Sequence, residues 1–135
     1  MTSIYELFAT DQNSEVEGIV YNVTPEISFT LARAGGANAR YSKLLSAKIR
    51  PYTRQIADDT MDPDMANALV IEAFAETVIL GWKGITDAEG NEMPFSVANA
   101  IALLKQLPDL FIDIQAYAGK MANFRAQEIT DIVGN

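Results

Sequence analysis

Two groups of acidic residues come closest to a constellation that could do chemistry, because several carboxylates gather within a few positions. The groups are Asp58, Asp59, Asp62 and Asp64, and then Asp87, Glu89 and Asn91 around Gly90. A calcium loop would place oxygen ligands at alternate positions, followed by glycine and a distant glutamate. Neither group has that pattern. We therefore expect the first group to cap helices and the second to form a turn.

The chain has 135 residues and contains neither histidine nor cysteine. It therefore lacks the usual general base, the thiolate nucleophile and the ligands of most zinc sites. It also has no disulfide framework, which fits a reducing compartment. We expect a protein that is not an enzyme and that has no catalytic, cofactor-binding or metal-binding residues.

The glycine pair Gly35–Gly36 allows two interpretations. Successive glycines let backbone N–H groups converge, so the pair could form a nest for an anion. No phosphate-binding motif surrounds it, and a flexible joint, with Asn38 capping the helix that follows, explains it better. In either case we expect one of the two glycines to adopt a backbone conformation that is closed to other residues.

Charge is distributed unevenly along this acidic chain, whose net charge is −8. Six of its ten basic residues lie between positions 27 and 57, a segment without any acid. They are Arg33, Arg40, Lys43, Lys48, Arg50 and Arg54. The segment could neutralise nearby acids such as Glu72 and Glu76, bind another protein or, against the overall charge, contact nucleic acid. We select Arg40, Lys43, Arg50 and Arg54 as candidate protein-binding residues.

A long apolar run, residues 65–82, is the element that must position these groups. Asp62 and Pro63 are typical of a helix start, so we expect a helix over 63–80. Its apolar residues lie nearly all round the helix, which is typical of a buried core helix. Glu72 and Glu76 interrupt the run, which argues against a membrane span. We expect Phe74 and Val78 to be buried.

The remaining pattern predicts one hairpin and several further helices. Alternating apolar residues on either side of Pro25 predict a hairpin over 18–32, with one face against helices. Helices are expected at 38–50, 52–58, 97–107 and 109–126, with a short one around Ile4, Leu7 and Phe8 and a frayed end over 127–135. An apolar stripe in the last long helix includes Leu110, and Phe111 widens it. The expected fold is mainly α, a compact single-domain bundle of about four helices with one small hairpin.

Several phrases of the sequence resemble a family of tail assembly chaperones from long-tailed (siphovirus-type) bacteriophages and prophages. The resemblance covers about residues 4–125. It rests most on ARAGGAN (32–38), ETVILGWKGITD (76–87) and LPDLF (107–111). None of these phrases is a catalytic motif.

The resemblance implies a helical, non-catalytic protein that binds the aggregation-prone, helical tape measure protein and promotes tail tube assembly. The tail tube protein and a longer, frameshifted form of the chain itself are further partners that it implies. It also implies a protein of the host cytoplasm that is absent from the mature virion. No signal peptide, membrane anchor or nucleic-acid partner is expected. Leu110 and Phe111 are apolar candidates for contacting such a client, although a core role suits them as well.

Two other functions stay open at the level of sequence. The chain could be a structural tail or connector component of the virion, and particle composition would distinguish this from a chaperone. It could also be a small nucleic-acid-binding regulator that uses the segment from Arg33 to Arg54. Such binding would depend steeply on salt concentration.

Overall fold

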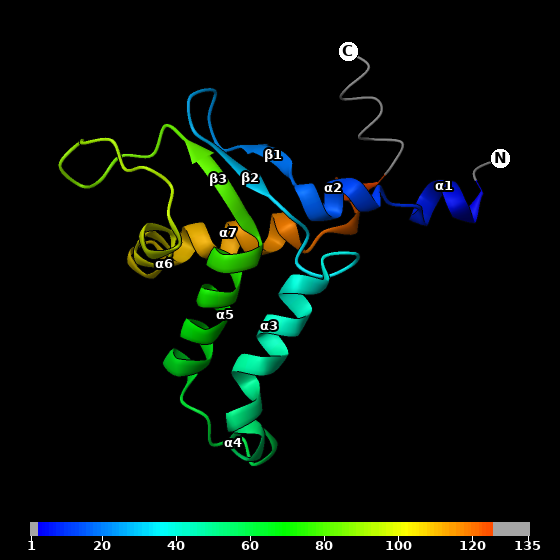
Figure 1. Cartoon of the computed structure of the whole chain (residues 1–135), viewed down its shortest axis with the longest axis vertical. Coiled ribbons are helices and arrows are strands. Elements are labelled where there is room, and N and C mark those ends of the chain that lie inside the picture. The colour runs from blue at the N-terminus through cyan, green and yellow to red at the C-terminus, as the bar shows by residue number, and fades with distance from the viewer. Residues whose placement is uncertain (1–2, 126–135) are drawn as a thin grey trace.

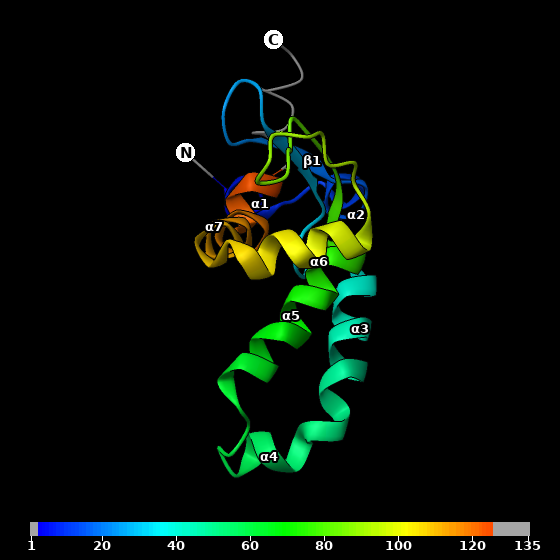
Figure 2. The same ribbon diagram turned by 90° about the vertical axis from the view of Figure 1, so that its left-hand side faces the viewer.

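The computed structural model describes residues 3–125, which form a layered body from which a helical arm projects (Figure 1). In chain order, the elements are α1 (Ile4–Phe8), α2 (Gln12–Glu17), β1 (Ile19–Asn22), β2 (Ser28–Leu31), α3 (Ala39–Ile49), the 3-10 helix η1 (Arg50–Tyr52), α4 (Thr53–Ala57), α5 (Pro63–Thr77), β3 (Ile79–Lys83), α6 (Val97–Gln106), α7 (Pro108–Ala118) and the 3-10 helix η2 (Met121–Phe124). The arm consists of α3, η1, α4 and the first half of α5, and α4 lies at its far end (Figure 2).

The sheet has three antiparallel strands in the order β1-β2-β3. The predicted hairpin is present as β1 and β2, with Tyr21 opposite Phe29. Phe29 lies opposite Trp82 of β3 on its other side. The alternation read from the sequence holds for β2, where Phe29 and Leu31 are buried and the residues between them only partly so.

The predicted helix over 63–80 is too long at its C-terminal end. Helix α5 stops at Thr77, and residues Ile79–Lys83 form strand β3 instead. The β-branched pair Val78–Ile79 and the aromatic Trp82 favour an extended backbone. A two-stranded hairpin is marginal alone, so pairing with β2 stabilises this arrangement. Helical periodicity could not reveal it, because a short apolar run fits a strand or a helix equally well.

The core lies where the C-terminal half of α5 meets the sheet, α6 and α7. As predicted, Phe74 and Val78 are buried, with 2% and 0% of their surface exposed. The Phe74 ring makes edge-to-face contacts with Tyr41 and Phe111, each with 5.3 Å between ring centroids. Such contacts add to the free energy of burial.

The first half of α5 is not buried all round, contrary to the sequence-based prediction. Met65 is 42% exposed, and the buried residues of the helix all lie between Ile71 and Thr77. The first half runs in the arm, where α3 covers it on one side (Figure 2). Apolar composition therefore did not guarantee burial here.

The fold is mainly helical with a small three-stranded sheet, and the expected four-helix bundle is wrong. Leu107, with φ −123° and ψ 78°, separates α6 from α7, so these two helices turn away from each other. The predicted helix over 109–126 is α7, which ends at Ala118, followed by η2. Gly119 ends α7, consistent with its low helix propensity. The expected frayed segment, 127–135, lies outside the described residues.

The other predicted helices have close counterparts. Those at 38–50, 52–58 and 97–107 appear as α3, α4 and α6, and the short N-terminal helix appears as α1. Asp62 and Ser96 cap their helices, accepting hydrogen bonds from the amides of Asp64 and Asn99. Over residues 3–125, no helix combines the length and hydropathy that crossing a membrane requires.

Both acidic groups serve the backbone as expected. Asp62 caps α5, while Asp58 ends α4 and Asp59 adopts a left-handed conformation with φ 55°. Asp87 accepts hydrogen bonds from the amides of Glu89 and Asn91, which closes the predicted turn. No group of three or more acids that could hold a metal ion occurs within residues 3–125.

Candidate protein-binding site

A shallow groove of about 490 Å³ runs along the arm where α3 meets the end of α5. It is lined by Arg40, Lys43, Leu44, Ala47, Glu76 and Thr77. The groove contains two of the basic residues that the sequence singled out, Arg40 and Lys43. It is therefore the place where the predicted binding residues and a concave surface coincide.

The amphipathic pattern of α3 positions these side chains. Tyr41 points toward the core, where it contacts Phe74, so its neighbours Arg40 and Lys43 lie on the exposed side of the helix. The Nη2 atom of Arg40 donates a 3.3 Å hydrogen bond to the carbonyl oxygen of Glu76. A guanidinium at the C-terminal end of α5 also interacts favourably with the helix dipole.

The chemistry of the groove is that of a docking surface for an amphipathic helix. Leu44 and Ala47 supply apolar contact area, and the cations of Arg40 and Lys43 lie at the edge. A partner helix could bury an apolar stripe against the floor while its acidic side chains meet the two cations.

The structure does not bring Arg50 and Arg54 to this groove. Arg50 begins η1 and Arg54 belongs to α4, so both lie at the far end of the arm (Figure 1). Pro51 ends the helix that carries Arg40 and Lys43, which separates the four residues into two pairs. The expectation that the segment neutralises acids holds for Lys48, whose Nζ lies 3.1 Å from a carboxylate oxygen of Glu72.

The two apolar candidates, Leu110 and Phe111, lie elsewhere in the body. Phe111 is 2% exposed and contacts Phe74, so it belongs to the core and presents no surface to a partner. Leu110 is half-buried and lines a separate apolar pocket of about 250 Å³ that also includes Ile27 and Leu107. The groove on the arm and this pocket are therefore two distinct surfaces.

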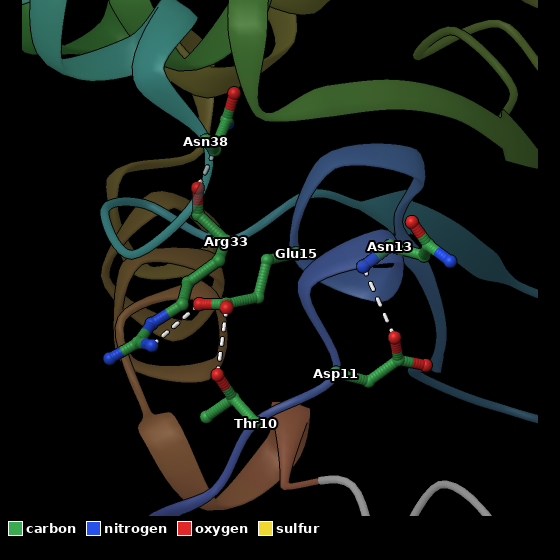
Figure 3. Close-up of polar contacts among 6 residues, drawn as sticks. All are labelled: Thr10, Asp11, Asn13, Glu15, Arg33 and Asn38. Atoms are coloured by element: carbon green, nitrogen blue, oxygen red, sulfur yellow. Dashed lines mark hydrogen bonds and ion pairs between the residues drawn. The ribbon is translucent and has the colours of Figure 1, made fainter.

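A buried ion pair fixes the root of the arm (Figure 3). The Oε2 atom of Glu15 lies 2.6 Å from Nη1 of Arg33, and its Oε1 atom accepts a 2.8 Å hydrogen bond from the hydroxyl of Thr10. Glu15 is only 2% exposed, so its charge needs these partners. The pair links α2 to the segment that leads into α3.

The glycine pair adapts the backbone to this ion pair. Gly35 and Gly36 have φ values of +129° and +53°, as expected for a conformation that favours glycine. A Cβ atom on Gly36 would lie 1.9 Å from Oε2 of Glu15. The polar group beside Gly36 is therefore the chain's own carboxylate, which explains the glycine without an external anion.

Asn38 does not cap α3 with its side chain, although it occupies the N-cap position. Its Nδ2 atom donates to the carbonyl oxygens of Arg33 and Thr77, at 2.9 and 3.0 Å (Figure 3 shows the bond to Arg33). The buried amide thus ties the start of α3 to the end of α5. The expected flexible joint is a fixed connection. Sequence reasoning missed Glu15 and this role of Asn38, because neither belongs to a recognisable spacing.

A second polar contact joins the hairpin to α7. The hydroxyl of Tyr21 donates to a carboxylate oxygen of Asp113, and the Tyr21 ring stacks on Tyr117 with 4.1 Å between centroids. This hydrogen bond, followed by burial, raises the pKa of Tyr21 from 10.0 to about 12. The contact orients the hairpin and offers no nucleophile at neutral pH.

The model of one protein family, described as YdaY prophage protein, matches residues 36–135. The match begins at Gly36 and contains α3, η1, α4, α5, β3, α6 and α7, so the arm and its groove lie within it. Helix α2, the hairpin and Glu15 precede it. Neither a curated protein nor a solved structure matches the chain.

Proposed function

The chain belongs to the YdaY prophage protein family, and from this premise we propose that it is a tail assembly chaperone. It binds the tape measure protein through the groove on the arm and promotes assembly of the tail tube around it. The family membership supports a phage-associated role. The resemblance of the sequence to tail assembly chaperones supports the more specific assignment.

The observation that carries the proposal is the half-covered arm. Its helix α5 has the composition of a core helix, yet its first half is covered by α3 on one side. Apolar side chains such as Leu69 and Val70 remain partly exposed, and Met65 and Ile56 are 42% and 48% exposed. Apolar surface of this kind, next to a groove edged by cations, is typical of a protein-binding site.

A helical client fits this surface best. The tape measure protein, which the resemblance implies as client, is long, helical and prone to aggregation. Covering an apolar stripe on such a helix removes the surface through which it would aggregate. Arg40 and Lys43 fix the orientation of the client by meeting its acidic residues.

The wider account is a non-catalytic protein without a cofactor. The tail tube protein and a longer, frameshifted form of this chain are further proposed partners. The proposed place of action is the host cytoplasm, and the proposed chaperone leaves the tail before the virion is complete. Detection of the chain in purified particles by mass spectrometry would contradict this account and favour a structural tail component.

A pull-down after co-expression with the tape measure protein tests the proposal. The informative variant is Arg40→Glu with Lys43→Glu, which reverses the charge at the groove. The matched control is Arg50→Glu with Arg54→Glu, which makes the same change in charge at the far end of the arm. We expect the groove variant to stay folded and lose the client, and the control to retain it.

Equal capture by the groove variant and the control would remove the groove from the mechanism. Failure of the unaltered chain to capture the tape measure protein would contradict the chaperone assignment itself. Circular dichroism of both variants checks that the fold is intact.

A further inference from the structure

Helix α1 carries a row of apolar residues that nothing in the described part of the chain covers. Ile4, Tyr5, Leu7 and Phe8 are between 42% and 79% exposed, and no residue of the helix is buried. A helix of five residues is far below the length of about 12–15 residues at which isolated helices become marginally stable. A capping box between Ser3 and Glu6 helps it form but supplies no apolar contact.

The described chain ends beside this helix. Arg125 forms a β-bridge with Thr10, two positions after the end of α1. The amide of Asp11 donates a 2.8 Å hydrogen bond to the carbonyl oxygen of Phe124. Residues 126–135 therefore start next to α1, held there by backbone contacts on both sides of Thr10.

The sequence of residues 126–135 matches the apolar row of α1 in spacing. Its apolar residues Ile129, Ile132 and Val133 are separated by three and four positions, as are Ile4, Leu7 and Phe8. Four extended residues span at most about 14 Å, while a five-residue helix is about 7.5 Å long. Ile129 and Ile132 can therefore reach every apolar residue of α1.

We propose that α1 is a docking site for the chain's own C-terminal segment, residues 126–135. Ile129, Ile132 and Val133 cover Ile4, Leu7 and Phe8, and the two ends of the chain stabilise each other beside the Glu15–Arg33 ion pair. A second copy of the chain would have to compete with a segment that is already tethered. The effective concentration of such a tethered segment is about 1 mM, roughly a thousandfold above a protein solution of about 1 μM.

The absence of native cysteine allows a direct test with the full chain. We would introduce Leu7→Cys with Ile132→Cys, and as a control Ile56→Cys with Ile132→Cys. Ile56 is a comparably exposed apolar residue at the far end of the arm. After mild oxidation of dilute protein, we expect an intramolecular disulfide in the first variant, formed at least about tenfold faster than in the control.

Disulfides that link two chains would show that a second copy covers α1 and would overturn the proposal. Oxidation no faster than in the control would overturn it as well, leaving α1 for another protein. A second readout is hydrogen exchange in Ile129→Asp with Ile132→Asp, where we expect the amides of α1 to exchange faster. Unchanged exchange would also contradict the proposal.

Discussion

The body and the arm differ in what surrounds their apolar residues, and α5 runs through both. In the body, the segment from Ile71 to Thr77 is enclosed by the sheet, α6 and α7. In the arm, the residues of α5 before Ile71 have similar composition and remain partly exposed. The comparison teaches that the neighbours of a helix, rather than its composition, decide which apolar surface stabilises the fold and which is left for a partner.

The largest expected effect comes from removing a large side chain in the body. Phe74→Ala should lower the free energy of unfolding by about 3–5 kcal/mol, because it deletes a buried aromatic that contacts Tyr41 and Phe111. Leu69→Ala, at a half-buried position of the same helix in the arm, should cost about 1–2 kcal/mol. Urea unfolding of both variants measures the difference.

Equal losses at the two positions would contradict the distinction between body and arm. A loss of less than about 1 kcal/mol for Phe74→Ala would show that the residue is not central to the core.

The next effect compares one ion pair from each region. Glu15→Ala should cost about 2–3 kcal/mol, because it leaves Arg33, only 20% exposed, without its carboxylate. Glu72→Ala, which removes the partner of Lys48 in the arm, should cost at most about 1 kcal/mol, because its carboxylate and the Lys48 ammonium are 34% and 21% exposed. Thermal unfolding at low and high salt checks both values.

Salt should weaken the arm pair more than the buried one, since screening acts mainly on exposed charges. Equal salt dependence of the two pairs would contradict their assignment to buried and exposed sites.

The smallest expected effect is a pH dependence from the contact between the hairpin and α7. The pKa of Tyr21 is raised to about 12 because its hydroxyl donates to Asp113 and is partly buried. The folded state therefore holds this proton more tightly than the unfolded state, whose tyrosine has a pKa near 10. Its stabilising contribution is complete below about pH 10 and is lost as the pH rises to about 12.

Melting temperatures across this pH range should fall less steeply in Tyr21→Phe than in the unaltered chain. Parallel pH profiles for the two proteins would show that the hydroxyl contributes nothing to stability.

Local features of the fold were predictable from the sequence. The hairpin, the caps at Asp62 and Ser96, and the unusual backbone of the glycine pair each depend on residues that are close in the chain. Their physical causes, alternation, capping and freedom from a Cβ atom, act within a few positions.

Features that depend on distant partners were not predictable. The strand at Ile79–Lys83 forms because β2 offers it an edge, and the buried charge of Glu15 is stabilised by Arg33, 18 positions away. At the candidate site, the sequence placed Arg40 and Lys43 on one face of a helix. It could not show that α5 completes the groove beside them, or that Pro51 would separate them from Arg50 and Arg54.

Hydrogen exchange of the chain alone and in complex with the co-purified tape measure protein tests the central claim most directly. The exchange pattern reports which backbone amides the client protects. We predict slower exchange in α3 and in the first half of α5 on binding, with α6 and α7 unchanged. Protection confined to α6, α7 or the sheet, with the arm unchanged, would contradict the assignment of the arm as the client-binding surface.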